Sequence, residues 1–435
     1  MSTKATKLPD GFGRLWTAQT VSSLGDGVTH AALPLIALTL TRDPMALAVV
    51  TAAGTLPWLI FGVLGGALVD RWDRRRTMWV ADTVRAVLLG IPAVAAWLDM
   101  LSIPLLAAVA FLLGLGGLFF DTAATAYLPD LLSRDPALLE RANSRLRGAQ
   151  TAMSGFAGPP AGSALLAVGR SVPLVADAVS FALSALLVRT LPATPRPVPE
   201  ARASLLMQAR AGASYVFRNR LLLGLALRPA VGNVAFLAVE TVLALFAHDR
   251  LGIGTFGFGL LLTAEATGGL LGAAIASQLG RRLGTGTALT CTAAIEGLAI
   301  LGLASASNPY IAGLALAVCG AAMGATMVLG PSLRQAIVPG HLMGRVASTS
   351  RMLAMCAAPV GAFLGGWLAT AYDLRTPLYA SAALLLTMTA VTASMTNNRR
   401  VEAALRAASP DAPDVGGPES PAAGEPAQES ASGLR

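Results

Sequence analysis

The stretch that decides the fold runs from Gly66 to Arg76 and reads GALVDRWDRRR. It follows a long apolar run and brings acidic side chains and four arginines together in one short segment. A glycine lets a helix end approach a neighbour closely. A charge cluster can form charge-assisted hydrogen bonds in one conformation and lose them in another. The stretch therefore predicts either a conformational gate or a loop whose arginines only fix its side of a membrane. The gate residues would be Gly66, Asp70, Arg71, Arg74 and Arg75.

The composition of the whole chain indicates a bilayer environment. Of the 435 residues, 54% are apolar and only 13% are charged, whereas soluble domains carry about 25% charged residues. So few charges could not cover a soluble globule of this size. We therefore predict an integral membrane protein with the lipid bilayer as its partner. A disordered, collagen-like or disulfide-rich secreted chain is excluded.

Twelve apolar runs are long enough to cross a membrane, since a spanning helix needs about 20 mostly apolar residues. They are rich in Leu, Ala, Val and Gly without alternation, which favours helices over a β-barrel. The predicted fold is thus all-α, with twelve transmembrane helices in two six-helix halves. The runs lie at about residues 14–40, 45–69, 77–98, 103–124, 148–168, 172–192, 221–247, 256–279, 286–306, 309–330, 346–371 and 376–396.

The predicted division of the chain has an N-terminal half at 1–192 and a C-terminal half at 221–396. The segment 193–220 between them is expected to be a central cytoplasmic loop. It contains either an amphipathic helix at the inner membrane surface, with apolar positions from Leu205 to Phe217, or a plain linker. The tail at 397–435 is rich in Ala, Pro, Ser and Glu and is expected to be a disordered cytoplasmic segment.

The positions of the basic residues test this topology. With twelve spans, the termini and even-numbered loops hold twenty-six of the 32 lysines and arginines, the odd-numbered loops hold four, and two lie within spans. Because loops rich in Lys and Arg stay in the cytoplasm, both termini are predicted to be cytoplasmic. The scattering of these residues between apolar runs excludes nucleic acid as a partner.

A second motif lies in the fifth apolar run, where Gly155, Gly158, Pro159 and Gly162 fall within eight residues. Glycines permit close helix contact, and proline bends a helix and frees backbone groups. The motif predicts a kinked, closely packed helix that either serves transport or is structural only. A Pro-x-Gly also recurs in the eleventh run at Pro359, and two similar halves are a known transporter plan with the substrate site between them.

The pattern Gly-x-Leu-x-Asp-Arg-x-x-Arg-Arg from Gly66 to Arg75 resembles the signature loop of the major facilitator superfamily, although Asp73 stands where that family usually has glycine. The resemblance covers about residues 1–396 and implies the twelve-helix fold and secondary transport. The Gly/Pro motif resembles one associated with antiporters in the superfamily. Other stretches resemble the branch with macrolide-efflux proteins and the enterobactin exporter. These are Leu128-Pro129, Arg141 to Ser144 and Asp177 to Phe181.

Charged side chains within spans are costly, and we treat them as functional by default. Asp26 and His30 share a face of the first span at i, i+4. Glu240 and Glu265 are mid-span acids, and we rank them above Glu296. A buried acid can load and release a proton near neutral pH. The candidates for proton coupling or substrate binding are therefore Asp26, His30, Glu240 and Glu265.

Structural roles are the alternatives for several of these charges. Asp26 would then bond to Asn233 or to a backbone group, and His30 would be a satisfied polar residue. Asp82 and Arg85, at i, i+3, are expected to pair with each other or with the loop of Asp70. Arg228, near a span end, is expected to extend its guanidinium to the membrane surface.

Several chemistries are excluded. A phosphate-binding loop needs a lysine after its second glycine, and the only lysines are Lys4 and Lys7, so the chain hydrolyses no ATP. The three histidines are far apart in sequence and the three cysteines lie within apolar runs. We therefore expect no metal site, no disulfide and no cofactor. The chain also has no Gly-x-Ser-x-Gly nucleophile motif, and we predict that it is not an enzyme.

We therefore expect a secondary transporter of a bacterial plasma (inner) membrane, acting as a monomer by alternating access. Its expected partners are protons and a hydrophobic or amphipathic small-molecule substrate, such as a drug, antibiotic or siderophore, exported by proton antiport. An importer or facilitator on the same fold is the alternative, since fold does not fix direction. From other classes, an integral-membrane enzyme and a non-transporting membrane sensor stay open.

Overall fold

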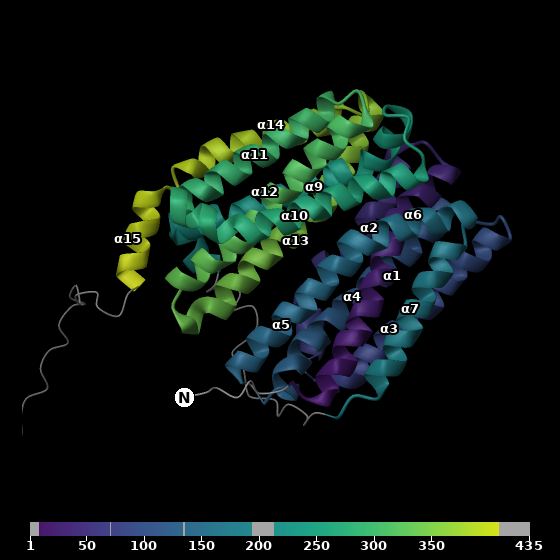
Figure 1. The fold of residues 1–435 in the computed structure, drawn as a ribbon, viewed down its shortest axis with the longest axis horizontal. Helices are drawn as coiled ribbons and strands as arrows, with labels where there is room; N and C mark the ends of the chain where they lie inside the picture. The colour runs from purple at the N-terminus through teal and green to yellow at the C-terminus, as the bar shows by residue number, and fades with distance from the viewer. Residues whose placement is uncertain (1–7, 70, 134, 194–212, 409–435) are drawn as a thin grey trace, which may run out of the picture.

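The computed structural model describes residues 8–69, 71–133, 135–193 and 213–408 (Figure 1). Within those ranges every regular element is a helix. The helices of the first half are α1 Asp10–Leu40, α2 Pro44–Val69, α3 Arg74–Trp97, α4 Ile103–Leu131, α5 Pro136–Gln150, the π-helix η1 Thr151–Ala157, α6 Gly158–Val168 and α7 Val172–Arg189. Those of the second half are α9 Arg220–Asp249, α10 Thr255–Leu283, α11 Thr285–Ser305, α12 Pro309–Ile337, α13 Gly340–Ala371, α14 Thr376–Ala393 and α15 Asn398–Ala408.

The described chain contains twelve helical crossings. Eleven are single helices long and apolar enough to span a membrane. The twelfth is the uninterrupted run of α5, η1 and α6, which the π-helix divides into shorter pieces. The predicted all-α membrane fold is thus confirmed. The helix that holds this crossing begins before the apolar run at 148, because Asp135 caps α5 by accepting hydrogen bonds from the amides of Ala137 and Leu138 at 2.9 and 3.1 Å.

The helices form two bundles, coloured purple to teal and green to yellow in Figure 1. Helices α1 to α7 pack mainly on one another, and so do α9 to α14. The main contacts between the bundles are α2 against α13 and α6 against α10. At the first of these, a Cβ added to Gly366 would lie 2.4 Å from the Cβ of Ala48. The domain boundaries expected from the sequence stay predictions.

The hydrophobic core is shared by both bundles at one end of the molecule and is divided between them at the other. At one end a single cluster of buried side chains joins both bundles and includes Ile36 of α1 and Val242 of α9. At the other end each bundle has its own cluster, with Tyr127 in the first and Leu289 in the second. We call the joined end the closed end. We call the other the basic end, because Arg71 and the three arginines in the first turn of α3 lie there. The ribbons diverge toward the basic end in Figure 1.

Charged residues link the turns at the closed end. Arg42, after α1, pairs with Asp249 at the end of α9 at 3.3 Å and so joins the two bundles. Arg250 pairs with Asp373, in the turn between α13 and α14. Burial would raise the pKa of Asp373, but hydrogen bonds from Arg250 and from two backbone amides hold that pKa below its ordinary value. Asp373 is therefore held as a carboxylate.

The structure differs from the sequence analysis in the central loop and in the C-terminal tail. The amphipathic helix expected at Leu205–Phe217 lies mostly outside the described residues, and Val216 is buried in the core of the second bundle rather than at a membrane surface. The start of the tail is not disordered, because α15 is a helix there. Its Val401 is buried in the same core, and α15 contacts α11 and α12. One apolar helix face was enough to order this segment. Residues 409–435 lie outside the described part.

Asn398 fastens α15 to the turn between α10 and α11. Its amide nitrogen donates to the carbonyl of Leu283 at 2.8 Å, and its oxygen accepts from the amide of Thr287 at 3.0 Å. Between these two residues, Gly284 has a φ of +81°, and an added Cβ would lie 2.3 Å from the amide nitrogen of Asn398. A glycine is required here both by the backbone conformation and by the close approach of Asn398.

We predict that Asn398→Ala releases α15 from this turn. Two hydrogen bonds are lost, each worth about 1 kcal/mol, so trypsin should cut the purified protein at the arginines of α15 at least tenfold faster. The rate is measured as loss of the C-terminal segment on a gel. Glu402→Ala is the matched control, because Glu402 is exposed and pairs only with Arg406 at 3.5 Å. Equal rates for Asn398→Ala and wild type would show that this contact does not hold α15.

Candidate functional site

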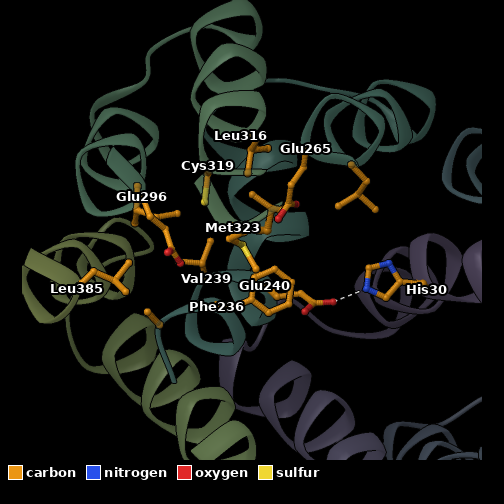
Figure 2. Close-up of a pocket in the computed structure, with 14 residues that line it drawn as sticks. His30, Phe236, Val239, Glu240, Glu265, Glu296, Leu316, Cys319, Met323 and Leu385 are labelled. Carbon is orange, nitrogen blue, oxygen red and sulfur yellow. Dashed lines mark hydrogen bonds and ion pairs between the residues drawn. The ribbon is translucent and has the colours of Figure 1, made fainter. Parts of the chain in front are cut away.

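Three glutamates from three helices of the second bundle meet at one cavity. Glu240 of α9, Glu265 of α10 and Glu296 of α11 line it together with His30 of α1 (Figure 2). About 470 Å³ of space between protein atoms lies in this cavity and its open mouth together. We call it the glutamate cavity. Two of its acids and His30 are sequence candidates, whereas Glu296 was ranked lower and lies in the same lining.

The rest of the lining is apolar. It includes Phe236, Val239, Leu316, Cys319 and Met323, which surround the carboxylates in Figure 2. Burying an ionised carboxylate among such side chains is costly unless it is paired or protonated. The arrangement can therefore bind an apolar molecule while its acids take up either protons or a positive group.

Helix geometry places the four polar residues at one depth. His30, Glu240, Glu265 and Glu296 each lie nine or ten residues from the closed end of their helices. At 1.5 Å per residue this is about 15 Å, which is the middle of a hydrocarbon layer about 30 Å thick. The glutamate cavity therefore lies at mid-depth along the spans.

His30 and Glu240 connect the two bundles inside this site. The Nε2 atom of His30 lies 2.6 Å from Oε1 of Glu240 (Figure 2). The histidine side chain is 49% exposed and the glutamate 20%. His30 therefore has a hydrogen-bond partner, and that partner comes from the other bundle. A change in the charge of either residue alters a contact between the halves.

Asp26 belongs to a different group of charges. The Nη2 atom of Arg85 donates to Asp26 at 2.7 Å, and Nη1 of the same guanidinium lies 3.5 Å from Asp82. The Asp82–Arg85 pair predicted from the i, i+3 spacing is thus confirmed. The alternative bond from Asp26 to Asn233 is wrong, because Asn233 donates to the carbonyl of Ala354 at 2.8 Å. Sequence reasoning missed the Asp26–Arg85 pair because its members lie on different helices.

The gate candidates lie at the basic end. Gly66 is in the last turn of α2, and Arg71 is exposed just after that helix. Asp70 lies outside the described residues. Asp73 caps α3, because its side chain accepts a hydrogen bond from the amide of Arg76 at 2.7 Å. The superfamily usually has glycine at this position, whereas here the aspartate starts a helix.

The two remaining gate arginines bind their own bundle. Arg74 pairs with Asp130 of α4 and donates to the carbonyl of Ala126 at 2.9 Å. Arg75 donates to the carbonyl of Leu191 at 2.7 Å. In this conformation both arginines therefore stabilise the first bundle, and their role in closing the basic end stays a prediction.

The Gly/Pro motif brings α1 and α6 into backbone contact. A Cβ added to Gly158 would lie 2.6 Å from the Cα of Gly27, and one added to Gly162 would lie 2.3 Å from the carbonyl oxygen of Val28. Gly155 faces α10, where an added Cβ would lie 3.1 Å from the Cβ of Ala266. The close packing expected from the motif is present, and its role in transport stays a prediction.

Proline explains the π-helix η1, which lies directly before α6. Pro159 and Pro160 have no amide hydrogen, so each removes an ordinary i→i−4 hydrogen bond. The backbone widens instead, and the amide of Gly158 donates to the carbonyl of Met153, five residues back. Isolated π-helical turns inside α-helices are frequent at functional sites.

Arg228 does not extend to the membrane surface, and that expectation is wrong. Arg228 is only 8% exposed. Its guanidinium donates to the hydroxyls of Thr392 and Thr290 at 3.0 and 3.1 Å, and to the carbonyl of Leu289. These partners on α11 and α14 satisfy the charge inside the second bundle, so it has no need to reach water.

Comparison with known proteins identifies the fold family. The family described as "Transmembrane secretion effector" matches residues 5–415. The chain belongs to this family of the major facilitator superfamily. The transporter is 27% identical over 396 residues to the multidrug efflux pump Tap of Mycolicibacterium fortuitum, which covers 89% of this chain and 96% of the relative. It is 23% identical over 363 residues to macrolide efflux protein A of Streptococcus pyogenes, which covers 81% and 88%.

Solved structures support the same architecture. The transporter matches the crystal structure of a bacterial homologue of the iron transporter ferroportin in its inward-facing state with a TM-score of 0.73. The match covers 90% of this chain and all of that one at 17% identity, so it shows the fold alone. Together these similarities make the chain a multi-pass membrane transporter rather than an enzyme.

Proposed function

We propose that this transporter exports hydrophobic or amphipathic small molecules from a bacterial cytoplasm in exchange for protons. Substrate and protons would compete for the glutamate cavity. The observation that carries this proposal is the meeting of Glu240, Glu265 and Glu296 at mid-depth in an otherwise apolar cavity. The names of the relatives, which are multidrug and macrolide efflux pumps, support export of this class of molecule.

Competition between protons and substrate gives a physical basis for antiport. The apolar lining attracts a hydrophobic body, while the carboxylates must be neutralised in so dry a place. Protons neutralise them in the empty transporter, and an amphipathic molecule with a basic amine can replace those protons. Each exchange of substrate for protons then couples the two fluxes in opposite directions.

The orientation proposed from the basic residues assigns the two ends. Placing both termini in the cytoplasm directs the basic end inward, and the core divided at that end then corresponds to an inward-facing state. In that state Arg42–Asp249 joins the bundles at the outer end, and His30–Glu240 joins them at mid-depth. The gate arginines Arg74 and Arg75 would make new contacts when the basic end closes. A switch of this kind needs a ligand that binds one state better.

Everted membrane vesicles from bacteria expressing the chain test the direction and the coupling. An inside-acid pH gradient is imposed, and the fluorescent lipophilic cation ethidium and the macrolide erythromycin are the probes. We expect both probes to enter the vesicles while protons leave, measured by fluorescence or radiolabel and by a pH-sensitive dye. Collapse of the gradient with nigericin should stop entry. Co-directional movement of probe and protons would indicate an importer, and entry that ignores the gradient would overturn proton coupling.

A further inference from the structure

The first bundle holds a second group of charges, most of them buried, that the proposed function does not use. It consists of Asp26 on α1, Asp82 and Arg85 on α3, and Asp177 on α7. We call it the Arg85 cluster. The guanidinium carbon of Arg85 lies 3.7 Å from the ring centroid of Phe181. The cation therefore packs on an aromatic face, which does not restrict it to one carboxylate partner.

Asp82 is the unusual member of the cluster. Its side chain is 0% exposed, and neither carboxyl oxygen has a hydrogen-bond partner among the described residues. The hydroxyl of Ser184 is buried next to this carboxyl group. Arg85 approaches Asp82 only to 3.5 Å and donates its hydrogen bond to Asp26 instead. An ionised carboxylate buried in this way would have its charge only partly compensated, because it shares the one guanidinium with Asp26, and that is costly.

Charge counting leads to the same result. The cluster contains one cation, and in the membrane interior one guanidinium stabilises one ionised carboxylate. Asp177 is satisfied by hydroxyls, since Thr29 and Ser180 donate to it at 2.6 and 3.0 Å. The remaining charge on a neighbouring helix, Asp121 of α4, is exposed. Asp82 is thus the fully buried acid whose one nearby cation, Arg85 at 3.5 Å, gives its hydrogen bond to another carboxylate.

We propose that Arg85 alternates between Asp26 and Asp82, and that each switch exchanges one proton between the cluster's two carboxyls. In the described conformation Arg85 pairs with ionised Asp26, and Asp82 keeps its proton. When the guanidinium moves to Asp82, the O–H bond of that carboxyl breaks and its proton leaves. Asp26 loses its cation and takes up one proton, so the total charge is unchanged.

The positions of the two acids give this exchange a direction. Asp26 is 44% exposed, whereas Asp82 is sealed, so Asp26 is the point of contact with solvent protons. Asp26 also lies one turn from His30 on α1, and a movement of α1 therefore acts on both the Arg85 cluster and the glutamate cavity. This coupling rests on the proposed function, whereas the proton on Asp82 does not.

Infrared spectroscopy of the purified full-length chain tests the proposal through the C=O stretching band of protonated carboxyl groups at neutral pH. Asp82→Asn should remove one carboxyl from that band. Asp99→Asn is the control and should leave the band unchanged, because Asp99 is 75% exposed and paired with Arg170 at 2.6 Å. Loss of an ionised carboxylate signal in Asp82→Asn would overturn the proposal.

A second variant is specific for the switch. Asp26→Asn removes an acid that is ionised in the wild type, yet it should also remove one carboxyl from the protonated band, since Arg85 is then free to pair with Asp82. An unchanged band in Asp26→Asn would overturn the alternation even if Asp82→Asn does not fold. Neither spectrum depends on transport. If the vesicles show no proton-driven entry but both spectra change as expected, the proposed function is wrong and the proposal for the Arg85 cluster is still supported.

Discussion

Replacing Glu240 by glutamine is expected to lower proton-driven ethidium export at least tenfold. Glutamine keeps the size of the side chain and an oxygen that can accept a hydrogen bond from His30, so the 2.6 Å contact between the bundles can persist. What is lost is the negative charge that protons and substrate share. A tenfold loss corresponds to about 1.4 kcal/mol, a modest value for one charge in so apolar a cavity.

Ethidium uptake into everted vesicles at several pH values measures this effect, with expression matched by immunoblot. Export by Glu240→Gln should be slow and should depend less steeply on pH than wild-type export, because Glu265 and Glu296 still line the cavity. Glu140→Gln is the matched control, because Glu140 is an exposed acid on α5, and it should behave as wild type. Wild-type export by the double variant Asp26→Asn/Glu240→Gln would falsify the proton-coupling assignment.

A second large effect is expected from Gly158→Ala, which should abolish export and lower the melting temperature. The new Cβ would lie 2.6 and 2.7 Å from the Cα and carbonyl carbon of Gly27. Both are backbone atoms, so no flexible side chain can move away, and α1 and α6 must separate. Overpacking of this kind costs about 1–3 kcal/mol. Displacement of α1 also moves Asp26 and His30 from their partners.

The melting temperature of purified protein and ethidium export together measure this effect. Gly148→Ala is the control on the same helical crossing, because a Cβ there meets nothing within 4 Å. Alanine favours a helix over glycine by about 1 kcal/mol, so this control should melt at the same or a higher temperature and export normally. A Gly158→Ala protein with unchanged melting and export would show that the crossing of α1 and α6 tolerates separation.

Membrane spans were the most predictable part of this protein. The seventh run was predicted at 221–247 and is α9 Arg220–Asp249, because the length of an apolar segment is set by the thickness of the bilayer. The exceptions are local. The helix of the fifth crossing begins at Pro136, before its apolar run, because of a cap, and α15 forms because its apolar face packs on the second bundle. The start of α5 and the formation of α15 each depend on a few side chains in a polar segment. The average composition of such a segment does not reveal them.

Candidate site residues were predictable as types but not as groups. Glu240 and Glu265 were found because acids within apolar runs are rare and costly. Glu296 was ranked lower, although it lines the same cavity. For Asp26, a bond to Asn233 or to a backbone group was the structural alternative, and Asp26 instead pairs with Arg85. Which acids meet depends on how each helix is rotated about its axis, and periodicity within a single helix carries no information about its neighbours.

The sequence by itself determined that the chain crosses a membrane twelve times and which charged residues lie within the spans, because burial in lipid penalises each residue independently. Only the tertiary structure decided which of those charges face one another. It brought three glutamates and His30 to one cavity, and it left Asp82 beside Arg85 without a hydrogen bond. Such pairings arise from packing between helices far apart in the chain, and the energy of a charge pair depends on distances that only packing sets.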